Sequence, residues 1–219
     1  VPECSFAVRY LHTFAGVMIT ASHNPKQYNG YKIYGPDGGQ MPPKASSVII
    51  SRARKANDLF KIPTMPVPEM RSKKLLHIIG ENVDEAYLKA ARSVNINHDL
   101  IRKIGPKLKF VYTPLYGTGK ILARRALQEA GFTNYTIVPQ QAIADPEFPD
   151  TPHPNPQYPQ AFHMAIQLGQ KINADVLIAT DPDADRLGAA VRQPDGEYKL
   201  LTGNQIASIL LNYILKAKQ

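Results

Sequence analysis

Three aspartates alternate along the segment DPDADR at residues 181–186. The apolar run DVLIAT at residues 175–180 comes directly before them, and ligands of open α/β sheets bind beyond the carboxyl ends of the strands. Three neighbouring carboxylates repel one another unless a cation neutralises them, and all-oxygen ligands favour Mg²⁺ over Zn²⁺. The residues alone leave two interpretations open: a Mg²⁺ site formed by Asp181, Asp183 and Asp185, or a solvated acidic turn.

Two other known kinds of acidic loop can be tested against the residues of this segment. A calcium-binding EF-hand loop needs glycine at its sixth position and glutamate at its twelfth, where this chain has Arg186 and Arg192, so the EF-hand is excluded. A Mg²⁺-dependent aspartyl-phosphate phosphatase would use Asp181 as its nucleophile and Asp183 as its acid/base, and it stays open on these residues alone.

A second polar segment, TASHNP at residues 20–25, contains a candidate nucleophile, Ser22. No G-x-S-x-G motif surrounds it, and the adjacent His23 is poorly placed as its base, so a hydrolase triad is not expected. A turn rich in hydrogen-bonding side chains is the simpler interpretation. Lys32 follows in NGYK at residues 29–32, and its amine reaches back toward the turn if the register of the predicted hairpin allows it.

The elements that position these residues follow from hydrophobic spacing and turn signals. We expect a hairpin with a long polar tip from GVMITA at residues 16–21 and YKIY at residues 31–34. The proline-rich segment 61–68 is expected to be extended or a loop, and the segment 139–159 cannot be regular structure throughout. Further strands are predicted at 109–112, 135–138, 175–180, 188–191 and 198–201, and helices at 44–57, 81–94, 120–130, 160–173 and from 204. This alternation predicts an α/β protein: two α/β domains with mixed, mostly parallel sheets flanked by helices.

Composition limits the possible classes of protein. The 219 residues are 43% hydrophobic and 20% charged, which is typical of a chain with a real core, and the single Cys4 fits a reducing cytoplasm. No apolar stretch reaches the roughly 18 residues of a membrane span. The net charge of +8 suggests a nucleic-acid-binding module as an alternative. All of that surplus lies between Lys44 and Lys109, where Phe60 and Tyr87 are the only aromatic residues, so base stacking has little support.

Taken in order, TASHNP, NGYK and DPDADR resemble the α-D-phosphohexomutase superfamily. TPLYGTG at residues 113–119, PNP at 154–156 and TGNQ at 202–205 resemble its phosphoglucomutase branch. The resemblance implies a fragment of a four-domain enzyme. Residues 1–97 would be the later part of domain 1, truncated at its N-terminus, 98–200 domain 2 with the metal loop, and 201–219 the start of the connection to an absent domain 3.

The resemblance also implies an activity and a set of site residues. The enzyme would interconvert hexose 1-phosphate and hexose 6-phosphate, most simply of glucose, through a phosphorylated Ser22 and a hexose 1,6-bisphosphate intermediate. Mg²⁺ would be held by Asp181, Asp183, Asp185 and a phosphate oxygen on Ser22. Lys32 would shuttle the proton of the sugar hydroxyl and bind substrate, Arg186 would bind phosphate, and His23 would be a hydrogen-bonding neighbour of Ser22.

The resemblance implies a small phosphosugar substrate and implies binding to neither nucleic acid nor a membrane. It leaves the oligomeric state open. The fragment alone is not expected to be fully active, because the domains that select the sugar would lie outside it. Many relatives have histidine where this chain has Tyr116, so the role of that loop is open. Gln157 stands where relatives commonly have glutamate.

Overall fold

The computed structural model describes residues 1–56 and 58–218, and the chain falls into two compact units. The large unit comprises Val1–Pro2, Ile19–Tyr31 and Leu88–Gln219, and the small unit comprises Glu3–Met18 and Lys32–Tyr87. The hairpin tip therefore belongs to the large unit, together with the acidic segment. The predicted division at residue 97 stays a prediction, and the predicted helix end at Asn57 lies outside the described residues.

A five-stranded mixed sheet organises the large unit, with strand order β4-β3-β5-β6-β7. β3 pairs in parallel with β4 and β5, whereas β5–β6 and β6–β7 are antiparallel. The mixed α/β fold class is thereby confirmed, with its parallel strands on one side of the sheet and antiparallel strands on the other. The strands are β3 (Phe110–Thr113), β4 (Tyr135–Ile137), β5 (Val176–Thr180), β6 (Leu187–Arg192) and β7 (Tyr198–Leu200).

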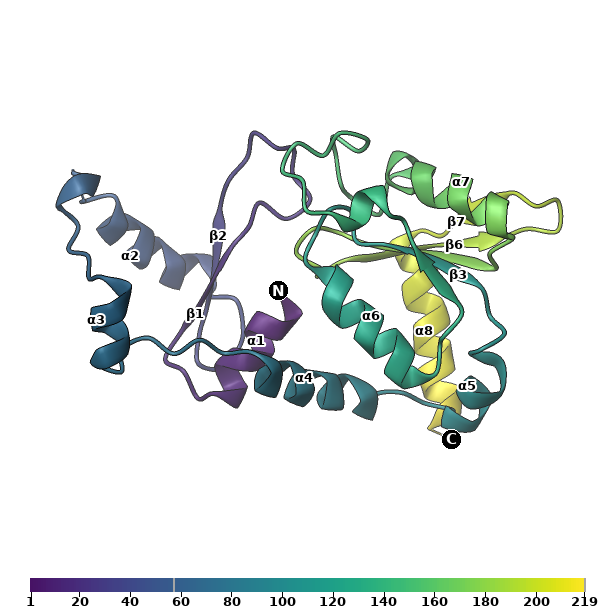
Figure 1. Ribbon diagram of the computed structural model, residues 1–219, viewed down its shortest axis with the longest axis horizontal. Helices are drawn as coiled ribbons and strands as arrows, with labels where there is room; N and C mark the ends of the chain where they lie inside the picture. The colour runs from purple at the N-terminus through teal and green to yellow at the C-terminus, as the bar shows by residue number, and fades with distance from the viewer. Residues whose placement is uncertain (57, 219) are drawn as a thin grey trace. The chain divides into compact units, whose positions relative to one another are not determined.

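Helices cover both faces of this sheet, with α6 and α7 on opposite faces (Figure 1). The chain moves from β3 through α6 to β4, and then back past β3 through α7 to β5. Right-handed crossovers in opposite directions place their helices on opposite faces, and a ligand site is expected where the direction reverses. That point lies between β3 and β5. The helical elements are α5 (His98–Ile104), α6 (Gly119–Ala130), η2 (Gln140–Ala142), η3 (Pro159–Phe162), α7 (His163–Ile172) and α8 (Gly203–Ala217).

The core of the large unit lies between the sheet and the segment η3–α7. Val111 of β3 and Leu177 of β5 are fully buried there against Phe162 and Ala165. A Cβ on Gly169 of α7 would lie 2.7 Å from Leu177 Cδ2, so glycine allows α7 to approach the sheet closely. The rigid packing at the centre of the sheet fixes the ends of β3 and β5, from which the two loops of the site emerge.

Local signals account for where the helices of the large unit begin and end. Gly131, with a φ of 102°, ends α6 in the left-handed conformation that glycine adopts readily. Thr202 and Gln205 form a capping box at the start of α8. Among the described residues, no helix combines the length and apolar character needed to span a membrane.

The small unit contains a two-stranded sheet, β1–β2, and mostly short helices. A Cβ on Gly16 would lie 2.5 Å from Val8 Cγ2, so glycine lets α1 pack on β1. Phe6 of α1 stacks on Tyr10 and meets Tyr87 edge to face, with centroid distances of 5.4 and 5.5 Å. The elements are α1 (Pro2–Tyr10), β1 (Gly16–Ile19), β2 (Tyr31–Tyr34), α2 (Pro43–Ala53), η1 (Leu59–Lys61), α3 (Val67–Ser72) and α4 (Glu81–Ser93), the last of which continues into the large unit.

Three helical segments differ from the sequence-based expectations. No element was predicted before residue 16, where α1 forms, and none between residues 94 and 109, where α5 forms. The proline-rich segment 61–68 was expected to be extended or a loop, yet α3 begins within it at Val67. Proline fits the first turn of a helix, because its missing N–H would have no partner there, so Pro68 helps to start α3.

Candidate active site

Two loops meet at the carboxyl ends of β3 and β5. The backbone N–H and the Oγ1 of Thr118 both donate to the carbonyl oxygen of Pro182, at 2.9 and 3.1 Å. A Cβ on Gly117 would lie 2.3 Å from Pro182 Cα, so only glycine lets the two backbones come this close. The loop after β3 thus supports the acidic loop after β5.

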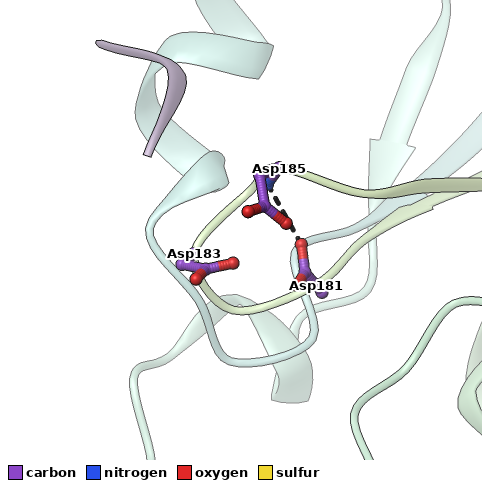
Figure 2. Close-up of side chains that lie close together, drawn as sticks. All are labelled: Asp181, Asp183 and Asp185. Carbon is purple, nitrogen blue, oxygen red and sulfur yellow. Dashed lines mark hydrogen bonds between the residues drawn. The ribbon is translucent and has the colours of Figure 1, made fainter. Parts of the chain in front are cut away.

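The acidic loop brings its three carboxylates together. Asp181 is fully buried, Asp183 is 3% exposed, and Asp185 is exposed. One carboxylate oxygen from each lies within 4.8 Å of the others, and Figure 2 shows the three groups turned toward a common space. Backbone N–H groups of Asp185 and Arg186 donate to Asp181 Oδ1 at 3.1 and 3.0 Å, which fixes the innermost carboxylate. Ala184, with a φ of 60°, makes the tight turn.

The hairpin tip places Ser22 directly against this cluster. Ser22 Oγ lies 3.0 Å from Asp181 Oδ2 and 3.3 Å from Asp183 Oδ1, so its single proton can be donated to either carboxylate. His23 Nδ1 lies 3.1 Å from the same Oγ and 3.9 Å from Asp181 Oδ2. Residues about 160 positions apart in the sequence therefore form one cluster of a hydroxyl, an imidazole and carboxylates.

Thr20 is a site residue that the sequence did not single out, although it belongs to the TASHNP motif. Its Oγ1 accepts the backbone N–H of Ser22 at 2.8 Å and donates to Asp183 Oδ2 at 3.1 Å. Ser22 has a φ of 55°, a left-handed conformation that is costly outside glycine. Thr20 thus connects the backbone of the strained Ser22 to Asp183 of the acidic loop.

Burial and charge repulsion determine the electrostatics of the cluster. Burial, reinforced by the hydrogen-bonding and charge interaction with Asp183, raises the pKa of Asp181 from 3.8 to about 6. The hydrogen bonds from Arg186 N–H and Ser22 oppose this rise. Two adjacent, buried carboxylates with a third beside them supply the oxygen donors that a hard divalent cation prefers, so these residues fit such an ion.

The remaining predicted residues are placed differently. Arg186 has an exposed side chain, and its backbone N–H donates to Asp181 Oδ1. Lys32 lies on β2 in the small unit, so its predicted role as proton shuttle stays a prediction. Tyr116 lies in the loop after β3, where its hydroxyl donates to Asp150.

Comparison with known proteins agrees with the motifs. The family model described as phosphoglucomutase/phosphomannomutase α/β/α domain II matches residues 85–196, and the model for domain I matches residues 1–59. The phosphoglucomutase of Staphylococcus epidermidis is 40% identical over 216 residues, which cover 98% of this chain and 38% of that protein. The phosphoglucomutase of Staphylococcus aureus is also 40% identical. The chain thus spans about two fifths of the length of these relatives.

Solved structures support the same assignment. A putative phosphomannomutase from Thermus thermophilus superposes with a TM-score of 0.70 at 25% identity, over 98% of this chain and 44% of that one. A phosphoglucomutase/phosphomannomutase family protein from Burkholderia thailandensis has the same fold, with a TM-score of 0.55 at 22% identity over 84% of this chain and 34% of that one. Because the domain II model alone covers more than half of the sequence, the chain belongs to the phosphoglucomutase/phosphomannomutase family.

Proposed function

We propose that the chain carries the phosphoryl-transfer centre of a phosphohexose mutase, with Ser22 as the residue that is phosphorylated. The observation that carries this proposal is the position of Ser22 Oγ, 3.0 Å from Asp181 Oδ2 and 3.3 Å from Asp183 Oδ1. A hydroxyl at the edge of a carboxylate cluster suits a site where a cation and a phosphoryl group bind together. The 40% identity to phosphoglucomutases favours glucose phosphates as substrates.

In the proposed reaction, the phosphoryl group passes from Ser22 to a free hydroxyl of a hexose phosphate. The P–O bond to Ser22 breaks as a P–O bond to the sugar oxygen forms, which gives a hexose 1,6-bisphosphate. Lys32 takes the proton of the sugar hydroxyl, and this proton ends on the serine oxygen. Transfer of the other phosphoryl group back to Ser22 then completes the isomerisation, and the proton moves in the opposite direction.

Charge balance explains why these residue types are required. A phosphoserine of about −2 and three carboxylates give a total near −5. A divalent cation held by Asp181, Asp183 and Asp185, with Mg²⁺ as our choice, would supply neutralising charge for the phosphoryl group. Arg186 would offer a bidentate guanidinium to phosphate oxygens. His23, within hydrogen-bonding distance of Ser22 Oγ, would orient the serine.

The buried carboxylate is a weaker candidate for the nucleophile than Ser22. Asp181 is fully buried, Oδ1 accepts two backbone N–H groups, and Oδ2 faces Ser22. Attack by Asp181 on a phosphate would require breaking these contacts. Ser22 is partly exposed, so the geometry favours a serine phosphate over an acyl phosphate.

Phosphorylation of the chain tests the proposal directly. The chain is incubated with glucose 1,6-bisphosphate and Mg²⁺, and its intact mass is measured before and after hydroxylamine treatment. We expect one phosphate that maps to Ser22, resists hydroxylamine and is absent from Ser22→Ala but present on the control Ser208→Ala, which alters an exposed serine of α8. A hydroxylamine-labile phosphate would indicate Asp181 instead. A hydroxylamine-resistant phosphate that persists on Ser22→Ala would contradict the proposal.

A further inference from the structure

The turn after β3 has an unusual backbone. Leu115 and Tyr116 are consecutive residues with positive φ, 46° and 65°. Both are buried, with exposed fractions of 0% and 6%. Side chains with a Cβ rarely adopt this conformation, and it persists where the surrounding structure holds it in place. Such strain is expected where the position of the backbone matters more than its local energy.

A buried polar network holds the backbone of this turn. Leu115 N–H donates to Thr113 Oγ1 at 3.2 Å, and Tyr116 N–H donates to the carbonyl oxygen of Gln141 at 2.8 Å. Thr113 Oγ1 in turn donates to Gln141 Oε1 at 2.6 Å, and Gln141 Nε2 donates to Thr151 Oγ1 at 3.2 Å. The turn is therefore tied to the proline-rich segment that precedes η3.

The side chain of Tyr116 makes a second connection to the same segment. Its hydroxyl donates to Asp150, and its ring meets Phe148 edge to face with centroids 6.0 Å apart. Burial and the neighbouring Asp150 raise the pKa of Tyr116 above its usual value, so the hydroxyl keeps its proton and remains a donor. Phe148 itself has a positive φ of 47°.

The strained turn acts on the acidic loop through the two residues that follow it. Gly117 lies against the backbone of Pro182, and Thr118 donates twice to the Pro182 carbonyl oxygen. Pro182 stands between Asp181 and Asp183. A rotation of Tyr116 out of its present conformation would therefore move the support of both buried carboxylates.

The proline-rich segment also contacts the other half of the site. Glu147 forms an ion pair with Lys26, four residues after Ser22. Pro25 of the hairpin tip lines one pocket together with Phe148 and other residues of that segment. The segment 145–152 thus contacts both the hairpin that carries Ser22 and the turn that supports the carboxylates.

We propose that Tyr116 and Asp150 are positioning residues, whose hydrogen bond holds the strained turn and thereby sets the geometry of the cation site at Asp181 and Asp183. This inference rests on the proposed function, because it takes a divalent cation to be the ligand of these carboxylates. Neither residue is a candidate catalytic group: each acts through Gly117, Thr118 and Pro182.

The test measures binding of Mg²⁺ alone, by calorimetric titration of the chain without any sugar phosphate. Tyr116→Phe keeps the ring and removes the hydroxyl. We expect it to weaken Mg²⁺ binding about 3- to 10-fold, less than the roughly 10- to 100-fold loss that follows removal of a direct partner of a metal ligand. Tyr116→His retains a ring N–H donor, so we expect it to recover part of the lost affinity.

The matched control is Tyr198→Phe, which also removes a hydrogen-bonded hydroxyl from the large unit. Tyr198 donates to the carbonyl oxygen of Ala174 at 2.6 Å and contacts neither loop of the site through that bond. We expect this variant to lose some thermal stability and to bind Mg²⁺ like the unmodified chain. A purely structural role for Tyr116 predicts that both variants behave alike.

The outcomes distinguish failure of the positioning role from failure of the cation site. If Asp181→Asn abolishes Mg²⁺ binding while Tyr116→Phe binds normally, the positioning role is wrong and the cation site stands. If the unmodified chain binds no Mg²⁺, or Asp181→Asn binds it unchanged, the cation site is wrong and the positioning role falls with it. Should Tyr116→Phe fail to fold, Asp150→Ala removes the acceptor at an exposed residue, and unchanged Mg²⁺ affinity in that variant would overturn the inference.

Discussion

Gly117→Ala tests how tightly the two loops of the site are packed. The added Cβ would lie 2.3 Å from Pro182 Cα, 2.4 Å from its carbonyl oxygen and 2.6 Å from its carbonyl carbon. All three contacts are with backbone atoms, so no side chain can rotate away to relieve them. The acidic loop or the loop after β3 must therefore shift by several tenths of an ångström.

The cost follows from the kind of contact. Overpacking a well-packed region costs about 1–3 kcal/mol, and contacts with a fixed backbone place Gly117→Ala near the upper end of that range. For a chain of about 220 residues, 1 kcal/mol corresponds to roughly 2–4 °C in Tm, so we expect Tm to fall by about 6–12 °C. Because the displaced loop carries Asp181 and Asp183, Mg²⁺ affinity should fall as well.

Gly203→Ala is the matched control, since a Cβ there meets no atom within 4 Å. Gly203 begins α8, where alanine is favourable to the helix, so Tm should stay unchanged or rise slightly. Both variants are compared by calorimetric unfolding with and without Mg²⁺. A Tm for Gly117→Ala within about 2 °C of the unmodified chain would show that the loops separate at a cost below ~1 kcal/mol, and would refute the reasoning.

Three further predictions concern stability. The pKa of Asp181 is raised from 3.8 to about 6 in the folded chain. In metal-free protein, the protonated Asp181 therefore adds to the free energy of unfolding below pH 4, and this stabilisation is lost as pH rises through 6. The loss is at most about 3 kcal/mol, and urea unfolding in EDTA should show a flatter pH profile for Asp181→Asn. Phe162→Ala removes a fully buried ring and should cost about 3–5 kcal/mol, measured from the urea midpoint. Thr202→Ala removes the capping box of α8 and should cost about 1 kcal/mol in the same assay, whereas Thr202→Ser should cost less.

Elements with strong local signals were predictable from the sequence. Gly131 ends α6 as expected because only a local conformational preference is involved. The apolar run of residues 175–180 forms the central strand β5, with Leu177 and Ala179 buried and the alternate residues partly buried. α1 was missed because Val8 is its only buried residue, which leaves little hydrophobic periodicity to detect. α3 was missed because prolines that usually interrupt regular structure lie here at a helix start.

The sequence allowed candidate residues of the site to be named, but not the contacts that hold its two loops together. Ser22 and the aspartates could be named as candidates from residue type and spacing, but those residues alone fitted a polar turn and a solvated acidic turn at least as well. The resemblance to the phosphohexomutase superfamily was what favoured a phosphoryl-transfer site. The role of Gly117 depends on a contact with Pro182, 65 residues later in the chain. A contact between loops so far apart in the sequence arises only once the sheet brings the ends of β3 and β5 together.

The distribution of charge along the chain bears on how the carboxylate cluster is neutralised. The whole surplus of +8 lies between Lys44 and Lys109, and none of the clustered residues Ser22, Asp181, Asp183 and Asp185 belongs to that stretch. The raised pKa of Asp181 shows that the cluster holds a proton more tightly than an isolated carboxyl group would. A divalent cation bound there, as we propose, would compete for the same oxygens, so its binding would release protons and weaken as pH falls below about 6. Mg²⁺ titrations at pH 5.5 and 7.5 should therefore differ in affinity, and equal affinities would place the cation elsewhere.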